Sequence, residues 1–295
     1  MLTSMRTEQQ MMTLILDTAE QDETIRAVIL NGSRANPNVT KDTFQDFDIV
    51  YAVASLEPYR RNPAWIDRFG ERLILQMPYE THIDPEASPP EEQERIVYLM
   101  QFKDGNRIDL TLMPTANAAY YQKLDSLSIV LLDKDGRIGE VPPSNDSDYH
   151  IRRPSEKVFR DNCNEFWWIC LNIGKGLRRE ELSYVMFMLE SINRKVLIRM
   201  LEWRIGAAAG WGVSAGKMGK YFKRHLSPDD WTQFQATYAS ADYAQMWQAL
   251  FQMCDLFGRT AAEVAERLHF TYHREEEMNV IAYLHEVHGL CDDNK

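Results

Sequence analysis

The sequence predicts an α+β fold: an N-terminal domain with a mixed β-sheet flanked by helices, followed by an all-helical C-terminal domain. Short β-prone apolar runs recur before residue 115, whereas apolar residues recur at helical spacing after Pro154. Between these parts, residues 132–154 are rich in proline, glycine and aspartate, which is the composition of a linker. We therefore expect two domains, residues 1–150 and residues 151–295.

The first domain is expected to begin with a helix at residues 7–20. Five strands are expected after it, at residues 25–32, 46–53, 72–77, 95–102 and 107–114. The sequence "KDGNR" at residues 103–107 predicts a hairpin turn between the last two strands. Residues 78–94 are proline-rich and acidic, so we expect an exposed loop there.

The second domain is expected to begin with a long helix at residues 155–178. Its apolar side chains recur at Phe159, Cys163, Phe166, Cys170 and Ile173, the spacing of one buried helix face. Ser155 stands at a typical helix start. Further helices are expected around residues 181–205, 215–225, 228–239, 242–268 and 274–288.

The composition limits the kinds of partner that this chain is expected to bind. The 295 residues carry a formal net charge of −11, which repels nucleic acid and attracts cations. No stretch reaches the roughly 18 apolar residues of a membrane span, so we expect no membrane partner and a cytoplasmic location. The four cysteines form no Cys-x-x-Cys pair, and neither a disulfide framework nor a zinc site is expected.

Three aspartates are expected on neighbouring strands of the first domain. Asp46 and Asp48 are two residues apart, so on a strand their side chains project to the same face. Asp109 lies in another β-prone run and is expected on the same sheet. Like charges held side by side raise a carboxylate pKa or cost stability unless a cation separates them, and Mg²⁺ is the usual cation. The alternative for each aspartate alone is a solvated edge or turn.

A Gly32-Ser33 turn directly follows the first strand. A glycine turn with a free backbone amide and a hydroxyl suits a phosphate group, although a single Gly-Ser pair is more often only a turn. Together with the aspartates, the turn predicts a site for a metal ion and a polyphosphate.

These residues resemble a known family. Gly32-Ser33, a twelve-residue gap and Asp46-Phe47-Asp48-Ile49 are similar to the signature of the DNA polymerase β-like nucleotidyltransferases, with Asp109 as third carboxylate. The chain more closely resembles the bacterial aminoglycoside 6-adenylyltransferases, from about Met5 to Tyr283. The segments that carry this resemblance are "NGSR", "FQDFDI", "DGNRIDLTLMP", "VLLDKDG", "RRP", "CNEFWW" and "GKMGKYFKRHL".

The resemblance implies transfer of AMP from MgATP to a hydroxyl of streptomycin, by resemblance the 6-hydroxyl. Residues 1–150 would be the nucleotidyltransferase domain and residues 151–295 a helical substrate-binding domain. Asp46 and Asp48 would bridge two Mg²⁺ ions, and Asp109 would hold the one near the acceptor hydroxyl. Gly32, Ser33 and Arg34 would bind the nucleotide phosphates.

The second domain contributes a basic segment. Lys217, Lys220 and Tyr221 lie in "GKMGKYFKRHL" and by resemblance would contact the triphosphate of ATP. Trp211 and Met218 break the spacing of a Walker motif, so the segment is not a P-loop. The alternative is a solvated basic helix face.

The long helix carries a polar and aromatic stripe. Asp161, Glu165 and Trp168 recur at one helix face, and carboxylates beside an aromatic ring suit a guanidinium-bearing aminoglycoside. Glu165 is also a candidate acceptor of the hydroxyl proton. A solvated face is the alternative.

Two other functions fit the same residues. One is a nucleotidyltransferase that acts on another small molecule or on a protein side chain. The other is a non-catalytic nucleotide-binding module, which would need fewer carboxylates. The sequence leaves the exact acceptor hydroxyl and the oligomeric state open.

Overall fold

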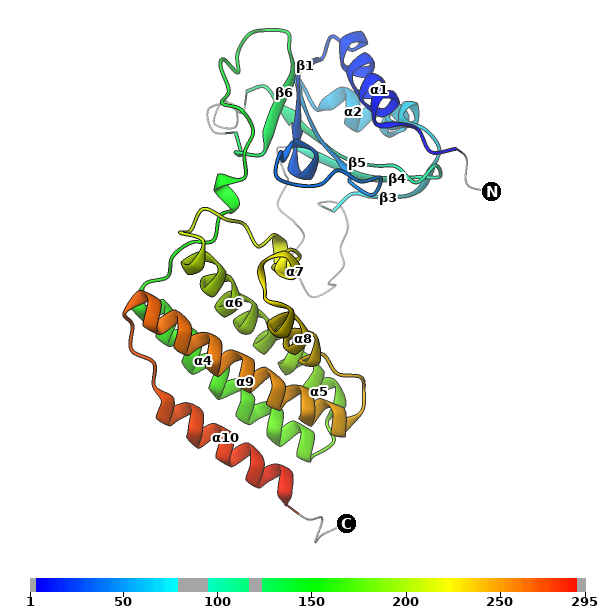
Figure 1. Cartoon of the computed structure of the whole chain (residues 1–295). Coiled ribbons are helices and arrows are strands. Elements are labelled where there is room, and N and C mark those ends of the chain that lie inside the picture. The colour runs from blue at the N-terminus through cyan, green and yellow to red at the C-terminus, as the bar shows by residue number, and fades with distance from the viewer. Residues whose placement is uncertain (1–3, 79–94, 117–123, 291–295) are drawn as a thin grey trace. The chain divides into compact units, whose positions relative to one another are not determined.

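The computed structural model describes residues 4–78, 95–116 and 124–290. Its backbone divides into two compact units, Met1–Asp148 and Tyr149–Lys295, next to the boundary expected at residue 150 (Figure 1). The expected loop at 78–94 lies outside the described residues except for residue 78. The described helices include none that is long and apolar enough to cross a membrane.

A six-stranded mixed sheet forms the centre of the first unit. Its strand order is β3-β4-β5-β2-β1-β6, with β2 and β5 parallel and the other neighbours antiparallel. The strands are β1 (Ile25–Asn31), β2 (Phe47–Val53), β3 (Arg72–Gln76), β4 (Ile96–Phe102), β5 (Arg107–Pro114) and β6 (Ser128–Asp133). The predicted α+β fold with a mixed sheet is therefore confirmed. The strand β6 was not predicted.

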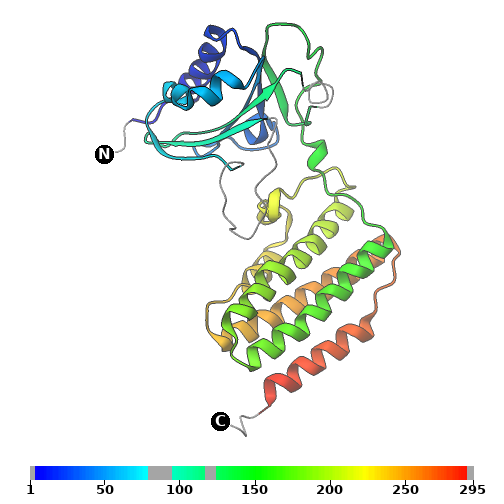
Figure 2. The same ribbon diagram turned by 180° about the vertical axis from the view of Figure 1, so that it is seen from behind.

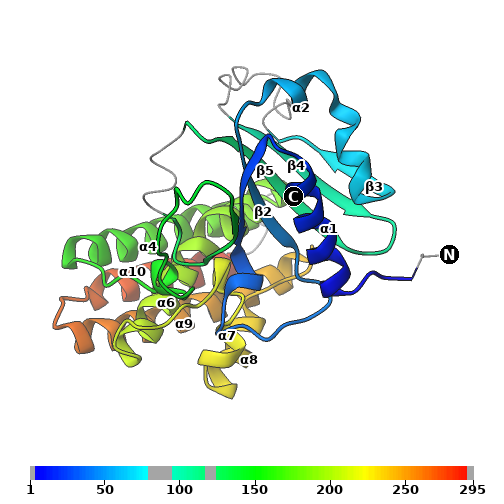
Figure 3. The same ribbon diagram turned by 90° about the horizontal axis from the view of Figure 1, so that it is seen from above.

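Helix α1 (Glu8–Gln21) covers one face of this sheet (Figure 3). Thr7 caps it in a capping box with Gln10, which satisfies two of the free amides at the helix start. Met11 and Ile15 of α1 are fully buried in the main core of the unit, and the Tyr51 hydroxyl on β2 donates to the Ile15 carbonyl at 2.6 Å. The same core takes in α2 (Glu57–Arg61) and the 3₁₀ segment Pro63–Phe69 through Tyr59, Trp65 and Phe69.

The opposite face of the sheet has a smaller apolar cluster. Ile29, Val50 and Met113 are buried there, and Leu124 and Ile138 pack against them. Side chains alternate between the two faces along a strand. Residues two or four positions from these three therefore also lie on the face away from α1.

The second unit is mostly helical, as predicted (Figure 1, and from behind in Figure 2). Its α-helices are α4 (Glu156–Arg178), α5 (Leu182–Met186), α6 (Arg194–Ala208), α7 (Phe222–His225), α8 (Pro228–Ala236), α9 (Tyr243–Leu268) and α10 (Arg274–Gly289). Helix α4 begins after Ser155, whose side chain accepts from the Val158 amide. All five apolar positions predicted for the buried face of this helix are buried. Phe166 stacks on Phe257 of α9 with ring centroids 3.7 Å apart.

Two predicted helices differ from the structure. The helix expected at residues 181–205 is divided by a π-helical segment, Phe187–Asn193, between α5 and α6. Of the helix expected at residues 215–225, only a 3₁₀ turn (Lys217–Gly219) and the short α7 form. Gly216, Met218 and Gly219 have positive φ angles of 71°, 56° and 73°, which an α-helix does not accommodate.

Candidate active site

A row of polar side chains crosses one end of the sheet, on the face away from α1. Asp48 of β2 lies directly beside Asp109 of β5 in the parallel pair, and beside Asn31 of β1 in the antiparallel pair. Ser128 of β6 continues the row and donates from its hydroxyl to the Asn31 side-chain oxygen at 2.8 Å. Residues paired in this way point to the same face, so four strands present oxygen atoms together.

The apolar neighbours of Asp48 and Asp109 determine the face of the sheet to which these aspartates point. Phe47 and Ile49, on either side of Asp48, are buried in the core beneath α1. Ile108 and Leu110 flank Asp109 and are buried in the same core. Each aspartate therefore points to the other side, as the alternation of the sequence predicts. Asp46 lies one residue before β2, and its side chain is 37% exposed.

Gly32 brings the main chain against Asp48. It opens a 3₁₀ turn, Gly32–Ala35, directly after β1 and has a φ of +73°. A Cβ atom placed on Gly32 would lie 2.2 Å from Oδ2 of Asp48, so only glycine fits without movement of the carboxylate. The Gly32 amide donates to the Leu127 carbonyl at 3.2 Å. Gly32 itself therefore does not supply the free amide expected from the sequence.

Burial and neighbouring carboxylates raise the pKa values of Asp48 and Asp46. Burial, followed by the charges of Asp109 and Asp46, raises the pKa of Asp48 to about 6. Burial also raises the pKa of Asp46, although Arg107 acts in the opposite direction. The site thus holds negative charge that a cation would stabilise.

Arg107 lies in this cluster and was not among the residues expected from the sequence. Its guanidinium binds both oxygens of Asp109, with Nε 2.7 Å from Oδ1 and Nη2 2.8 Å from Oδ2. Nε is also 3.6 Å from Oδ2 of Asp46. The signal that could have found it is its position two residues before Asp109, which puts both side chains on one face of β5.

Arg34 is held at the entry to β2. Its guanidinium lies over the Phe47 ring, 3.8 Å from the centroid, and donates to the Gln45 and Asp46 carbonyls at 2.7 and 3.0 Å. Burial lowers its pKa, and Glu8, at 3.4 Å, acts against this. Arg34 thus fixes the backbone from which the Asp46 carboxylate projects.

The predicted residues of the second unit lie on its surface. Asp161, Glu165 and Trp168 occupy an exposed face of α4, where Trp168 is 62% exposed and Asp161 pairs with Lys157 at 2.5 Å. A single exposed indole also occurs on faces that only meet water, so the exposure of Trp168 alone does not assign a function to this face.

The basic segment forms a compact turn. Gly216 is packed so closely against Tyr221 that a Cβ would lie 2.7 Å from its ring. The Tyr221 amide donates to the Ala215 carbonyl at 2.9 Å. Lys220 Nζ is 5.1 Å from the Tyr221 ring centroid. The turn therefore fixes Lys220 and Tyr221 relative to each other.

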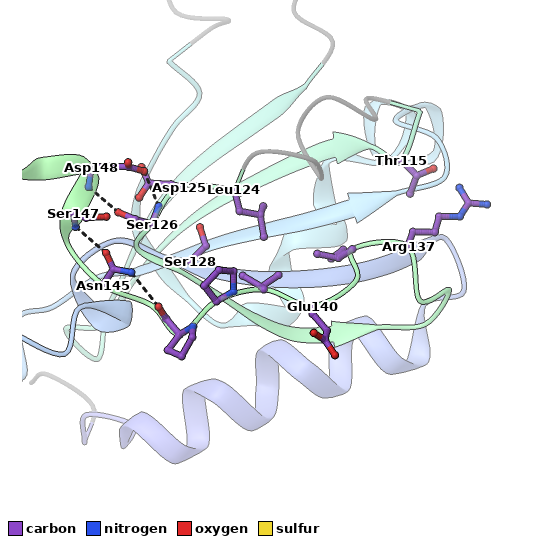
Figure 4. A pocket seen from close by; sticks show the side chains of 14 residues that line it. Thr115, Leu124, Asp125, Ser126, Ser128, Arg137, Glu140, Asn145, Ser147 and Asp148 are labelled. Carbon is purple, nitrogen blue, oxygen red and sulfur yellow. Dashed lines mark hydrogen bonds between the residues drawn. The ribbon is translucent and has the colours of Figure 1, made fainter.

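A cavity of about 730 Å³ opens on the sheet face that carries the polar row (Figure 4). Leu124 and Ile138, which pack on the small apolar cluster of this face, line it together with Ser128. Its edge is fixed by a pair of hydrogen bonds between Ser126 and Asp148, of 2.9 and 3.1 Å. Nothing in the sequence pattern indicated this cavity, because most of its lining residues, from Arg137 to Asp148, belong to the segment that has the composition of a linker.

The carboxylates are suitable ligands for a hard cation, but Asp109 and Asp46 are already paired with Arg107. In the described part of the chain, no group of three or more His, Cys, Asp or Glu side chains is arranged to hold a metal ion. Both oxygens of Asp109 accept from Arg107. Oxygen ligands of this type are the ones that Mg²⁺ prefers.

Comparison with known proteins gives a consistent result. The streptomycin adenylyltransferase family matches residues 5–287. An aminoglycoside 6-adenylyltransferase of Bacillus subtilis (strain 168) is 41% identical over 269 residues, which are 91% of this chain and 93% of that protein. One of Campylobacter jejuni is 38% identical over 99% of this chain and 100% of its own length. A crystal structure of an aminoglycoside 6-adenyltransferase from Bacillus subtilis is similar with a TM-score of 0.47 and 35% identity, over 97% of this chain and 100% of that one.

Proposed function

The chain belongs to the streptomycin adenylyltransferase family of nucleotidyltransferase enzymes, and we propose that it transfers AMP from ATP to the 6-hydroxyl of streptomycin, with pyrophosphate leaving. Its relatives are named for adenylylation of aminoglycosides at position 6. The modified streptomycin would no longer act as an antibiotic. The enzyme would thereby confer resistance.

The row of Asp48 and Asp109 beside the Gly32 turn is the observation that carries this proposal. Transfer of a nucleotidyl group needs the phosphate held close to the reacting hydroxyl and the developing negative charge stabilised. The close approach of Gly32 to Asp48 leaves no side chain between the turn and the carboxylate. Ser33, the next residue, would contact the terminal phosphates from this turn.

Three carboxylates, those of Asp46, Asp48 and Asp109, would hold Mg²⁺. They fit because they supply hard oxygen atoms, and because burial and the charge of Asp109 raise the pKa values of Asp46 and Asp48. When bound, Mg²⁺ supplies charge stabilisation of the phosphates and lowers the pKa of the acceptor hydroxyl. Arg34 fixes the backbone at Asp46 and so orients the first of these side chains. Asp109 would accept the proton of the acceptor hydroxyl on a carboxylate oxygen.

Residues of the second unit would recognise both substrates. Lys217, Lys220 and Tyr221 would contact the triphosphate, where lysine ammonium groups neutralise its charge. Asp161, Glu165 and Trp168 form an exposed acidic and aromatic surface on α4, which suits the guanidinium groups of streptomycin. The net charge of −11 favours approach of such a cation. It also disfavours a nucleic-acid partner, and we place the enzyme in the cytoplasm, where ATP is available.

Pyrophosphate release from ATP and Mg²⁺, measured across a panel of aminoglycosides, tests the proposal. Streptomycin is expected to give the highest kcat/KM, and NMR of the product is expected to place AMP on the 6-hydroxyl. A higher kcat/KM with an aminoglycoside that lacks guanidinium groups would overturn the choice of substrate while leaving the adenylyltransferase activity in place.

A further inference from the structure

Arg107 places a positive charge inside the carboxylate cluster. It forms the two parallel hydrogen bonds of 2.7 and 2.8 Å that a guanidinium makes with a single carboxylate, here Asp109. Its Nε is also 3.6 Å from Asp46. The strand fixes this arrangement, because residues 107 and 109 share one face of β5.

Arg107 contacts two of these carboxylates directly. Its guanidinium lies within 4 Å of both Asp109 and Asp46. Arg34 instead directs its hydrogen bonds to the main-chain carbonyls of Gln45 and Asp46. The cluster thus carries three carboxylates and one guanidinium bonded to a carboxylate of the cluster.

We propose that Arg107 is the resident counter-ion of this cluster and competes with divalent cations for Asp109. The proposal rests on the proposed function, in which Asp46, Asp48 and Asp109 hold the metal. Both oxygens of Asp109 are occupied by Arg107. Each oxygen keeps a second lone pair, but a metal ion that takes the lone pairs facing the guanidinium displaces Arg107, and an ion bound through the other lone pairs shares the charge of Asp109 with Arg107.

The competition has two consequences for the protein. The first is a weaker affinity for a bare divalent ion than three carboxylates alone would give. The second is a smaller dependence of folding stability on metal, because part of the like-charge repulsion is already offset. The site would therefore carry less net negative charge before a metal ion and a nucleotide arrive.

Calorimetry with Mn²⁺ or Mg²⁺, without nucleotide or aminoglycoside, tests the competition. The Arg107→Gln protein is expected to bind the ion with a Kd lower by roughly 3- to 30-fold, the range of a partly exposed bidentate ion pair. Arg107→Lys keeps the charge but loses the bidentate geometry, so an intermediate Kd is expected. Lys103→Gln is the matched control. It removes one positive charge from the same hairpin, where Lys103 pairs with Glu71 away from the cluster, and the Kd is expected to stay within about twofold.

The Asp109→Asn variant shows whether Arg107 affects the Kd for the metal ion through Asp109. In this background, Arg107→Gln is expected to change the Kd little, because the group over which the two cations compete is gone. If Arg107→Gln lowered the Kd equally in the wild-type and in the Asp109→Asn background, the cause would be a general charge effect, and the proposal would be overturned. An unchanged or higher Kd in both Arg107 variants, or no measurable binding in any of the proteins, would also overturn it.

Thermal unfolding tests the competition independently of calorimetry. Mn²⁺ is expected to raise the Tm of Arg107→Gln by more than that of the wild type, because the tighter ligand stabilises more. An equal shift would contradict the competition. None of these measurements uses turnover, so an enzyme that binds metal as expected but does not modify streptomycin would refute only the proposed substrate.

Discussion

The main chain of Gly32 lies directly against the carboxylate of Asp48, with room for a hydrogen atom and not for a methyl group. A Cβ atom at this position would lie 2.2 Å from Asp48 Oδ2, and the φ angle is +73°, so glycine is required for two separate reasons. The contact with Asp48 concerns the site, and the positive φ concerns the backbone. The two reasons can be separated by experiment, because the chain contains another glycine with a positive φ and no close contact at its Cβ position.

Gly32→Ala is expected to lower kcat by about 10²-fold, because the methyl group displaces Asp48 from its position. Gly136→Ala is the matched control, since Gly136 has a φ of +63° and nothing within 4 Å of its Cβ position. Both variants should lose about 1 kcal/mol of stability from backbone strain. Steady-state kinetics and urea unfolding measure the two effects. Equal kcat values for the two variants would show that the contact with Asp48 is unimportant.

The Lys217→Ala and Lys220→Ala variants are expected to raise the KM for ATP by about 10-fold or more, the effect of a lost charge-assisted contact to phosphate. The KM for streptomycin should change much less. Lys223→Ala, on the exposed side of α7, is the control and should leave both values near those of the wild type. Equal effects of the two lysine variants on both substrates would mean that the turn only supports the fold.

Glu165→Gln separates binding of the aminoglycoside from proton transfer. If Glu165 orients a guanidinium group, the KM for streptomycin rises while kcat changes little. We expect this result, because Asp109 and the metal would already lower the pKa of the acceptor hydroxyl. A fall in kcat of about 10² to 10⁴-fold, with loss of the acidic limb of the pH profile, would instead assign Glu165 as the base. Unchanged binding and turnover would leave it on a solvated face.

Asp104 is expected to make stability depend on pH. Burial disfavours its charge, but hydrogen bonds from Arg6 and Asn106 outweigh burial and hold the pKa of Asp104 well below its usual range. A depressed carboxyl pKa stabilises the folded protein above the pKa of the unfolded chain, about 4, and this contribution is lost as the pH falls below that value.

Asp104→Asn should therefore cost about 1 to 3 kcal/mol at pH 7, and the difference from the wild type should shrink below about pH 4. Urea unfolding at a series of pH values measures it. Asp17→Asn, on the exposed side of α1, removes the same charge and should have little effect at any pH. A difference between Asp104→Asn and the wild type that is the same at pH 3 and pH 7 would contradict the assignment.

The sequence was sufficient where a local pattern determines the structure. Apolar neighbours on both sides of Asp48 and Asp109 predicted strands with one buried face, and both aspartates lie on the opposite face of adjacent strands. The five apolar positions of α4 likewise predicted its buried face. In these cases the period of the pattern alone decides which side is buried.

The features that were not predicted depend on contacts between residues that are far apart in the sequence. The strand β6 was not predicted because it leads directly into the segment that has the composition of a linker, and its place at the edge of the sheet depends on pairing with the remote strand β1. The helix expected at residues 215–225 does not form because Gly216, Met218 and Gly219 take positive φ angles. Arg107 contacts Asp46, which lies one residue before β2, and Ser128 contacts Asn31 of β1. Both contacts depend on a strand register that the sequence does not reveal.

The assignment of the aspartates is tested most directly by the amount of pyrophosphate released from MgATP and streptomycin, in the wild type and in Asp46→Asn and Asp48→Asn. Both variants should fold, with a Tm in EDTA equal to or above that of the wild type, because removing one charge relieves like-charge repulsion. The wild type should form one pyrophosphate for each adenylylated streptomycin, and each variant should be slower by at least about 10²-fold. Near-normal turnover in either folded variant would contradict the assignment of these carboxylates to the reaction.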